Sequence, residues 1–291
     1  MCDKFYILCF NIIFLIIIGI KLSNYDFSYD PVTALREDQA KGKTAEIFSD
    51  IRKTMNIPLI TSIWRGLAGM NNSLEEVWTL TKPIYLTGTP ELALNKMINS
   101  VYFPSLNSFN HKEFSQEDIT DIRNIIKVYN KSNGMNLMAL SAFIISEYKP
   151  SINISNTNIQ KQIIKTELPR LLNKDEISSD IWDIVKNVNS IGSPKGINSH
   201  VATLWRHLAH WPNFLELVYT KLRSIEEKGE ILKTSKDMLN YIKVDGINLK
   251  RQKTKYNISE ETFSTIHNYV KDTNQVIRMV VLGNMIDKWI E

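Results

Sequence analysis

Apolar residues recur at spacings of three and four along most of this chain. In residues 114–130, Ile119, Ile122, Ile126 and Tyr129 fall on one face of a helix, which is the pattern of an amphipathic helix. Ser115, followed three residues later by Asp118, is a sequence signal for the start of that helix. No run alternates apolar and polar positions with the period of two that strands require. The pattern therefore predicts an all-α fold.

Two stretches are nearly apolar on every side, residues 134–148 and 274–289, and we expect them to form central helices. Polar residues interrupt the first of these regions at 128–140, so a loop between two helices is predicted there. Asn130 and Asn133 would then lie near the interior. A buried amide needs a hydrogen-bond partner, so each would pair within the protein or bind a ligand.

One sequence pattern occurs twice. Residues 62–78, "SIWRGLAGMNNSLEEVW", resemble residues 203–219, "TLWRHLAHWPNFLELVY", in the order of their hydroxyl, Trp-Arg, Leu-Ala, Leu-Glu and aromatic positions. Two further matches occur in the same order: 46–55 with 176–185, and 115–127 with 259–271. Three collinear matches indicate a tandem duplication.

The duplication predicts two helical repeats that face each other across a pseudo-twofold axis. Each repeat would contain a helix, a tight corner, a second helix and then paired helices. The expected division is a first repeat at 45–148, a linker at 149–175 and a second repeat at 176–291. Residues 228–257 are polar and mixed, which predicts a surface helix and a loop.

Residues 1–44 precede the repeats and contain an unusual apolar run, "FYILCFNIIFLIIIGI" at 5–20. A membrane-spanning helix needs about 20 apolar residues, so this run is slightly short for one. Three interpretations remain open: an uncleaved anchor or signal sequence, translation from a start codon assigned too early, or a buried helix. The body would be cytoplasmic, or anchored to a membrane or exported if residues 5–20 are present.

Composition excludes several kinds of site. The net charge is only +4 and is spread along the chain, so no nucleic-acid partner is expected. Cys2 and Cys9 are the only cysteines, and both precede the repeats. The body therefore lacks the residues for a disulfide framework or a Cys-x-x-Cys pair. No glycine-rich phosphate loop is found, and no cofactor is expected.

Arg65 and Arg206 occupy the same position in the two copies of the repeated pattern and are its most distinctive polar residues. We expect each to pair with an acid of its own repeat, because arginine and acids are duplicated together. The candidate acids are Glu46 and Asp50 for Arg65, and Glu176 and Asp180 for Arg206. The alternative is that an arginine holds the carboxylate of a ligand through two hydrogen bonds.

His200, His207 and His210 cluster near the second corner. A zinc site would need converging ligands, usually with a carboxylate, and the spacing of seven and three residues crosses an expected helix end. We therefore predict no metal and expect histidines whose hydrogen bonds are satisfied near a helix end.

The motif AEIFSDIRKTMNIP (45–58), the twin Trp-Arg-x-Leu-Ala corners, HLAHWPNFL (207–215) and YNKSNGMNLMAL (129–140) together resemble the group I 2-haloacid dehalogenases, the DehI type. The resemblance covers about 45–291. It implies an all-α fold of two tandem repeats with the active site between them. That fold is similar to the one found in AhpD-like proteins.

The resemblance also implies a reaction. In that family an aspartate activates a water that displaces the halide directly, and an asparagine helps to hold the water. Carried onto this chain, the asparagine is Asn133 and the base position is Leu204. Leu59, Ser62 and Thr203 would line the substrate pocket.

Leucine cannot accept a proton from water, so two functions stay open. The first is a 2-haloacid dehalogenase-like hydrolase acting on carbon–halide bonds with an altered base. The second is a non-catalytic or small-molecule-binding helical protein of the same fold. A small organic acid is the candidate partner. A carboxylate within reach of Asn133 would favour the first.

Overall fold

The computed structural model describes residues 34–145, 167–193, 201–247 and 258–291. The described residues form helices and no strand, which confirms the all-α fold. The helices are α2 (Gly42–Met55), α3 (Ser62–Leu67), α4 (Ser73–Leu86), α5 (Thr89–Ser100), α6 (Gln116–Ile145), α7 (Ser179–Ser190), α8 (Thr203–His207), α9 (Pro212–Glu227), α10 (Glu230–Asp245), α11 (Glu260–Lys271) and α12 (Val276–Trp289), with short 3-10 turns η1 (Glu37–Gln39), η2 (His111–Glu113), η3 (Lys174–Glu176) and η4 (Leu208–His210).

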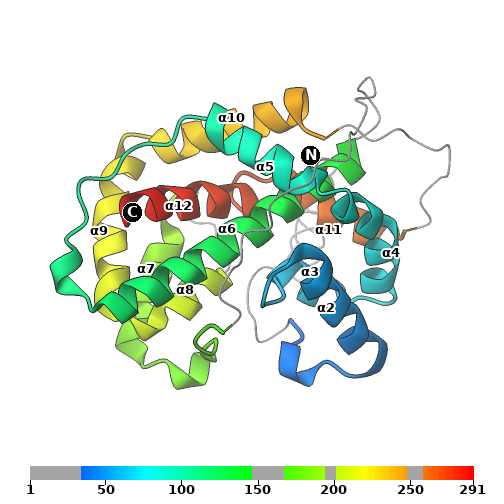
Figure 1. Cartoon of the computed structure of the whole chain (residues 1–291), viewed down its shortest axis with the longest axis horizontal. Helices are drawn as coiled ribbons and strands as arrows, with labels where there is room; N and C mark the ends of the chain where they lie inside the picture. The colour runs from blue at the N-terminus through cyan, green and yellow to red at the C-terminus, as the bar shows by residue number, and fades with distance from the viewer. Residues whose placement is uncertain (1–33, 146–166, 194–200, 248–257) are drawn as a thin grey trace, which may run out of the picture.

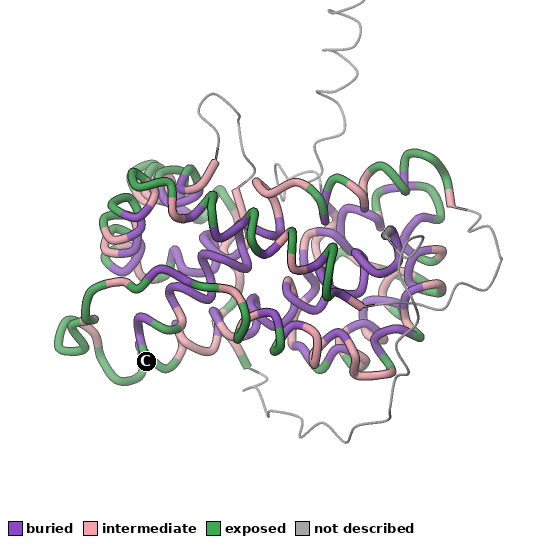
Figure 2. The backbone as a smooth tube through the Cα atoms, turned by 90° about the horizontal axis from the view of Figure 1, so that it is seen from above, coloured by how far each residue is buried: buried purple, intermediate pink, exposed green. Residues whose placement is uncertain are grey.

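The centre of the molecule is the pair α6 and α12, which make the most extensive contact between helices in the described residues (Figure 1). Both helices are largely buried, and the exposed residues lie mainly on the surrounding helices (Figure 2). This confirms, for the described residues, the prediction that the two nearly apolar stretches form central helices. Burial of apolar area stabilises such a pair by about 25 cal/mol per Å².

The helices pair in the same order in both halves of the chain. α2 packs on α4 as α7 packs on α9, and α5 packs on α6 as α10 packs on α12. Contacts also cross between the halves, because α3 meets α11 and α8 meets α6. This order agrees with a duplicated arrangement. The near-twofold superposition and the repeat boundaries stay predictions.

Two hydrogen bonds near the N-terminal ends of α6 and α11 connect the two halves. Asp118, in the first turn of α6, accepts a hydrogen bond from Trp211 Nε1 at 2.6 Å. Thr262, at the matching position of α11, shares a hydrogen bond of 2.7 Å with Ser73. Both helices begin with a serine cap. Ser115 accepts from the N–H of Asp118, as the sequence indicated, and Ser259 accepts from that of Thr262.

The predicted loop at 128–140 is wrong, because α6 is a continuous helix of 30 residues. Two of its buried polar side chains, Asn136 and Lys131, have partners in neighbouring segments, so their burial does not require the backbone to leave the interior. Asn136 bonds to three side chains of the first half, and Lys131 pairs with Glu91 of α5 at 3.1 Å. Satisfied polar groups of this kind allow a helix with polar residues to run through a core.

Gly134 explains how α5 approaches α6 so closely. A Cβ at this position would meet the Leu94 side chain at 2.4 Å. A glycine inside a helix costs about 1 kcal/mol relative to alanine, and here the close contact with α5 gives the reason for it.

Two further predictions concern segments near the edges of the described chain. α10 is a half-exposed surface helix, as expected within 228–257, whereas the loop predicted after it lies outside the described residues. Residues 5–20 also lie outside them. Within the described ranges, no helix has the length and apolar character needed to cross a membrane.

Candidate functional site

A cavity of about 70 Å³ lies between the two halves. Its walls come from the start of α3, the middle of α6, the start of α8, the end of α11 and the first turn of α12. An engineered cavity of ~150 Å³ holds benzene, so this one is roughly half that size and suits a ligand of a few non-hydrogen atoms.

Four of the five residues that the sequence predicted for a site lie around this cavity. Ser62, Asn133, Thr203 and Leu204 all contribute to its wall. Leu59 does not, because α3 begins at Ser62 and Leu59 packs against the core in the turn before it. The structure thus brings together residues from three helices that are far apart in sequence.

Arg65 is the main charged group of the cavity wall, and its predicted pairing with an acid is wrong for the described residues. None of their carboxylates lies within 4 Å of it. The guanidinium instead donates from Nη2 to Thr203 Oγ1 at 3.1 Å, while its Nε is buried without a partner. Burial lowers the pKa of Arg65, and Tyr129 and Glu37 act against this effect.

The acids expected to bind Arg65 are engaged elsewhere. Asp50 accepts hydrogen bonds from Trp78 Nε1 at 2.8 Å and from Lys82 at 3.0 Å, and Glu46 faces Lys43. The sequence pattern placed arginine and acid in the same repeat, but α2 turns its acids toward α4 and solvent. The side chain of Arg65 points the other way, toward α8.

The negative charge of Glu37 raises the pKa of Arg65, but this carboxylate is not available for chemistry in the cavity. Its two oxygens accept hydrogen bonds from Arg52 Nη1 and from the backbone N–H of Ile60, each at 2.6 Å. Glu37 therefore fixes the segment that enters α3 and stays outside the cavity wall.

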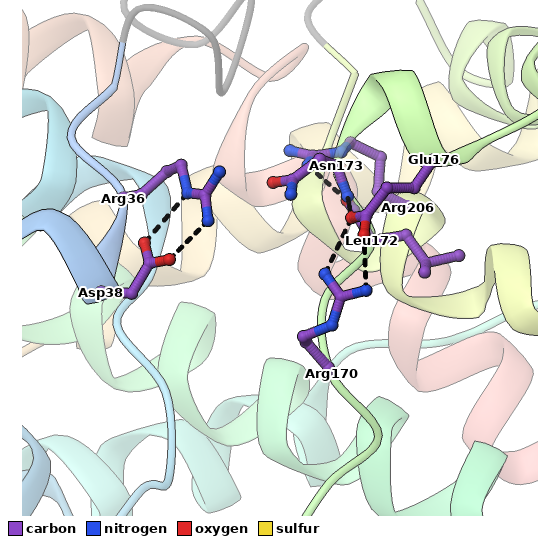
Figure 3. A network of polar contacts seen from close by, with 7 residues as sticks. All are labelled: Arg36, Asp38, Arg170, Leu172, Asn173, Glu176 and Arg206. Carbon is purple, nitrogen blue, oxygen red and sulfur yellow. Dashed lines mark hydrogen bonds and ion pairs between the residues drawn. The ribbon is translucent and has the colours of Figure 1, made fainter.

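Arg206 makes a different contact from its sequence counterpart. It donates to the backbone carbonyl of Leu172 (Figure 3). Glu176, one of its expected partners, is bound by Arg170 through two hydrogen bonds of 2.8 and 2.6 Å. That contact, together with the N–H of Asn173, lowers the pKa of Glu176 to about 2. The pairing of Arg206 with an acid stays a prediction.

The histidines of the second corner hold the same segment as Arg206. His207 Nε2 donates to the carbonyl of Pro169, and His210 Nε2 lies 2.7 Å from the carbonyl of Arg170. The interpretation as histidines satisfied near a helix end is therefore confirmed for these two, and His200 lies outside the described residues. No group of three potential metal ligands occurs in the part of the chain that the structure describes.

The burial of His207 makes the stability of the fold depend on pH. Burial lowers its pKa from the usual 6.5 to about 4, although the carbonyl of Pro169 acts against the shift. Between these two pH values the unfolded chain binds a proton that the folded chain does not. Stability should therefore fall by about 3 kcal/mol as the pH drops from 6.5 to 4.

His207→Gln should reduce the slope of stability against pH, because glutamine keeps a donor for Pro169 but does not titrate. The measurement is urea unfolding at pH values from 4 to 7. Equal slopes for the parent and His207→Gln would contradict the assignment.

Sequence reasoning missed Arg278, although an arginine inside an apolar helix was the available signal. This residue of α12 also lines the cavity. It donates to the carbonyls of Asn274 at 3.0 Å and Ile191 at 2.9 Å, and also to that of Asn189. Burial lowers its pKa to about 10, so it remains charged at neutral pH.

Among its described residues, the cavity wall thus has a positive character and no acid or imidazole. Its described residues include two buried arginines, the amide of Asn133 and the hydroxyls of Tyr129 and Tyr269, but no Asp, Glu or His. Such a wall can bind an anion and donate hydrogen bonds to it. It lacks a carboxylate or imidazole that could take a proton from water.

No protein-family model and no curated protein matches the sequence. Among solved structures, a D-2-haloacid dehalogenase mutant in complex with D-2-CPA matches with a TM-score of 0.65 and 12% identity, over 89% of this chain and 95% of the other. A second such mutant gives 0.64 and 13% over 89% and 95%, and a D-2-haloacid dehalogenase in complex with L-LA gives 0.60 and 12% over 89% and 96%. The chain therefore has the all-α fold of the D-2-haloacid dehalogenases, as the resemblance of its sequence implied.

Proposed function

We propose that this chain binds a small organic acid in the cavity and does not hydrolyse carbon–halogen bonds by the water-activating mechanism that the resemblance implies. The observation that carries the proposal is Arg65. It is a buried cation in the cavity wall with no carboxylate within 4 Å among the described residues.

A buried charge is costly unless it is paired, so a guanidinium in this position has a strong preference for an anion. A carboxylate accepts two parallel hydrogen bonds from arginine, which suits a ligand held against the wall of a small cavity. Arg278 adds to the positive potential of the same wall. The small volume favours acids of two or three carbons.

Hydrolysis lacks support because the base position is apolar. Leu204 is buried in the cavity wall beside Thr203, and the amide of Asn133 can hold a water but cannot deprotonate it. The solved structures that share this fold are described as haloacid dehalogenases, which makes a small acid a reasonable ligand class here. The reaction itself depends on a general base, and the described residues of this wall include no carboxylate or imidazole.

Arg65→Met should lower the affinity for propionate by about 10- to 100-fold, because a hydrogen-bonded charge pair is lost. Isothermal titration calorimetry on the full chain at pH 7 measures the effect. Propionamide, which has the same shape without the charge, should bind the parent at least 10-fold more weakly than propionate.

Arg223→Met is the matched control, since Arg223 lies on α9 in an exposed ion pair with Glu227, away from the cavity. It should leave the affinity for propionate unchanged. If propionate and propionamide bind equally, or if both arginine variants behave alike, Arg65 does not hold a carboxylate and the proposal fails.

A further inference from the structure

The helix α10 has an outer face that neither the core nor the cavity uses. The helix lies along one edge of the molecule (Figure 1). Its inner side is buried through residues such as Ile231, Met238 and Ile242. Its outer side, which we call the α10 face, consists of the exposed residues Leu232, Lys233, Lys236, Lys243 and Val244.

Large apolar side chains are concentrated on and beside the α10 face. Among the described residues, five large apolar side chains are exposed, and three of them belong to this region. Leu232 is 43% exposed and Val244 is 71% exposed. Tyr102, which is 70% exposed, lies beside α10, because its carbonyl accepts a hydrogen bond from Thr234 Oγ1 at 3.3 Å. Exposed apolar residues that gather on one surface mark a site of contact with another molecule or a membrane.

The same region carries positive charges that are not neutralised by ion pairs. Three lysines of α10 form no ion pair with a carboxylate of the described residues, namely Lys233, Lys236 and Lys243. α5, which packs beside α10, adds Lys96, and none of the exposed residues of α5 is acidic. Against these four lysines stand two exposed acids of α10, Asp237 and Asp245, so the region is positive.

An anionic lipid surface matches both properties of this region. Lysine keeps its ammonium group in water or among headgroups while its methylene stem covers apolar surface, and tyrosine is favoured at the membrane–water interface. The negative potential of anionic lipids attracts lysines that lie near the surface. The apolar run at 5–20 favours lipid over an acidic protein as the partner, because stable peripheral attachment takes two signals in one chain.

We propose that the α10 face binds the surface of a membrane that contains anionic lipids. The contact is peripheral, because the inner side of α10 is packed in the core and no helix of the described ranges can cross a membrane. The lysines supply an attraction that salt weakens, and Leu232 and Val244 supply apolar contact that salt does not weaken. The proposal depends on this surface alone and not on the carboxylate site.

The test measures binding of the full chain to vesicles by cosedimentation. Vesicles of phosphatidylcholine and phosphatidylserine in equal amounts should bind the chain at least 10-fold more tightly than phosphatidylcholine alone, and added salt should weaken this binding. The combined change Lys233→Gln, Lys236→Gln and Lys243→Gln should weaken it by about 100-fold, since one lysine near an anionic surface contributes about 5-fold.

A second variant tests the apolar part of the contact. Leu232→Ser combined with Val244→Ser should weaken binding to the phosphatidylserine vesicles by about 10-fold, because less apolar area is buried against the lipid. The dependence of binding on salt should stay that of the parent, since no charge changes.

The matched control removes three exposed lysines from other helices. Lys41→Gln, Lys53→Gln and Lys271→Gln change residues at the start of α2, near its end and at the end of α11. This control has the same net charge as the triple variant of α10 and should bind vesicles like the parent. All the changed side chains are exposed, and thermal melting verifies that each variant is folded.

Three results would overturn the inference. Equal losses in the α10 variant and the control would mean that net charge alone attracts the chain to lipid. Binding that is unchanged by the α10 substitutions, or equal for both kinds of vesicle, would place the membrane contact elsewhere in the chain. If the parent binds no vesicle, lipid is not the partner of the α10 face, and an acidic protein takes its place as the occupant.

Discussion

The chain as it stands should release no halide above background from either enantiomer of 2-chloropropionate, and Leu204→Asp should raise release by about 10²–10⁴-fold, the usual effect of a positioned general base. The reason is geometric. Leu204 lines the cavity together with Asn133, so an aspartate there would face a water held by that amide. The nearby Arg65, which already bonds to Thr203, would help to keep the new carboxylate ionised.

Leu204→Asn is the matched control, because asparagine has the size of aspartate but cannot deprotonate water. It should remain at background, and thermal melting of both variants checks that the buried substitution leaves the chain folded. Halide released by the unchanged chain at a rate unaffected by His207→Gln would show that another base exists. The assignment of the base position to Leu204 would then be wrong.

Much of the helical fold could be predicted because its signals are local. The Ser115 and Ser259 caps and the start of α9 at Pro212 depend on residues within one turn of each helix end. The central position of α12 follows from its nearly continuous apolar character. The loop at 128–140 was wrong because polar residues in one sequence window do not reveal partners on α3, α4 and α5.

The candidate site likewise contains residues that the sequence could predict and contacts that it could not. The resemblance brought Ser62, Asn133, Thr203 and Leu204 into consideration, and the structure places them around one cavity. The partner of Arg65 was beyond local reasoning, because Thr203 lies 138 residues away and acids near Arg65 in sequence offered a simpler pairing. The contact of His207 was also beyond local reasoning, because its partner is the carbonyl of Pro169, a backbone group that no side-chain pattern reports.

Asn136→Leu should lower the free energy of unfolding by about 3–6 kcal/mol. The side chain is fully buried, and its Oδ1 accepts from Trp64 Nε1 at 3.2 Å and from the Tyr85 hydroxyl at 2.9 Å. Its Nδ2 donates to Thr61 Oγ1 at 2.9 Å, in the cavity wall. Leucine of similar size would leave three buried polar groups without this partner, and each such loss costs about 1–3 kcal/mol.

Urea unfolding at pH 7, followed by circular dichroism, measures the change, since the midpoint shift at constant slope reports stability. Ser141→Ala on the same helix is the matched control. Ser141 is also buried, but its hydroxyl has no hydrogen-bond partner among the described residues, so its removal should change stability by less than about 1 kcal/mol. Equal effects of the two substitutions would mean that the hydrogen bonds of Asn136 do not hold α3 and α4 to α6. The wall of the cavity at Thr61 would then owe its position to apolar packing alone.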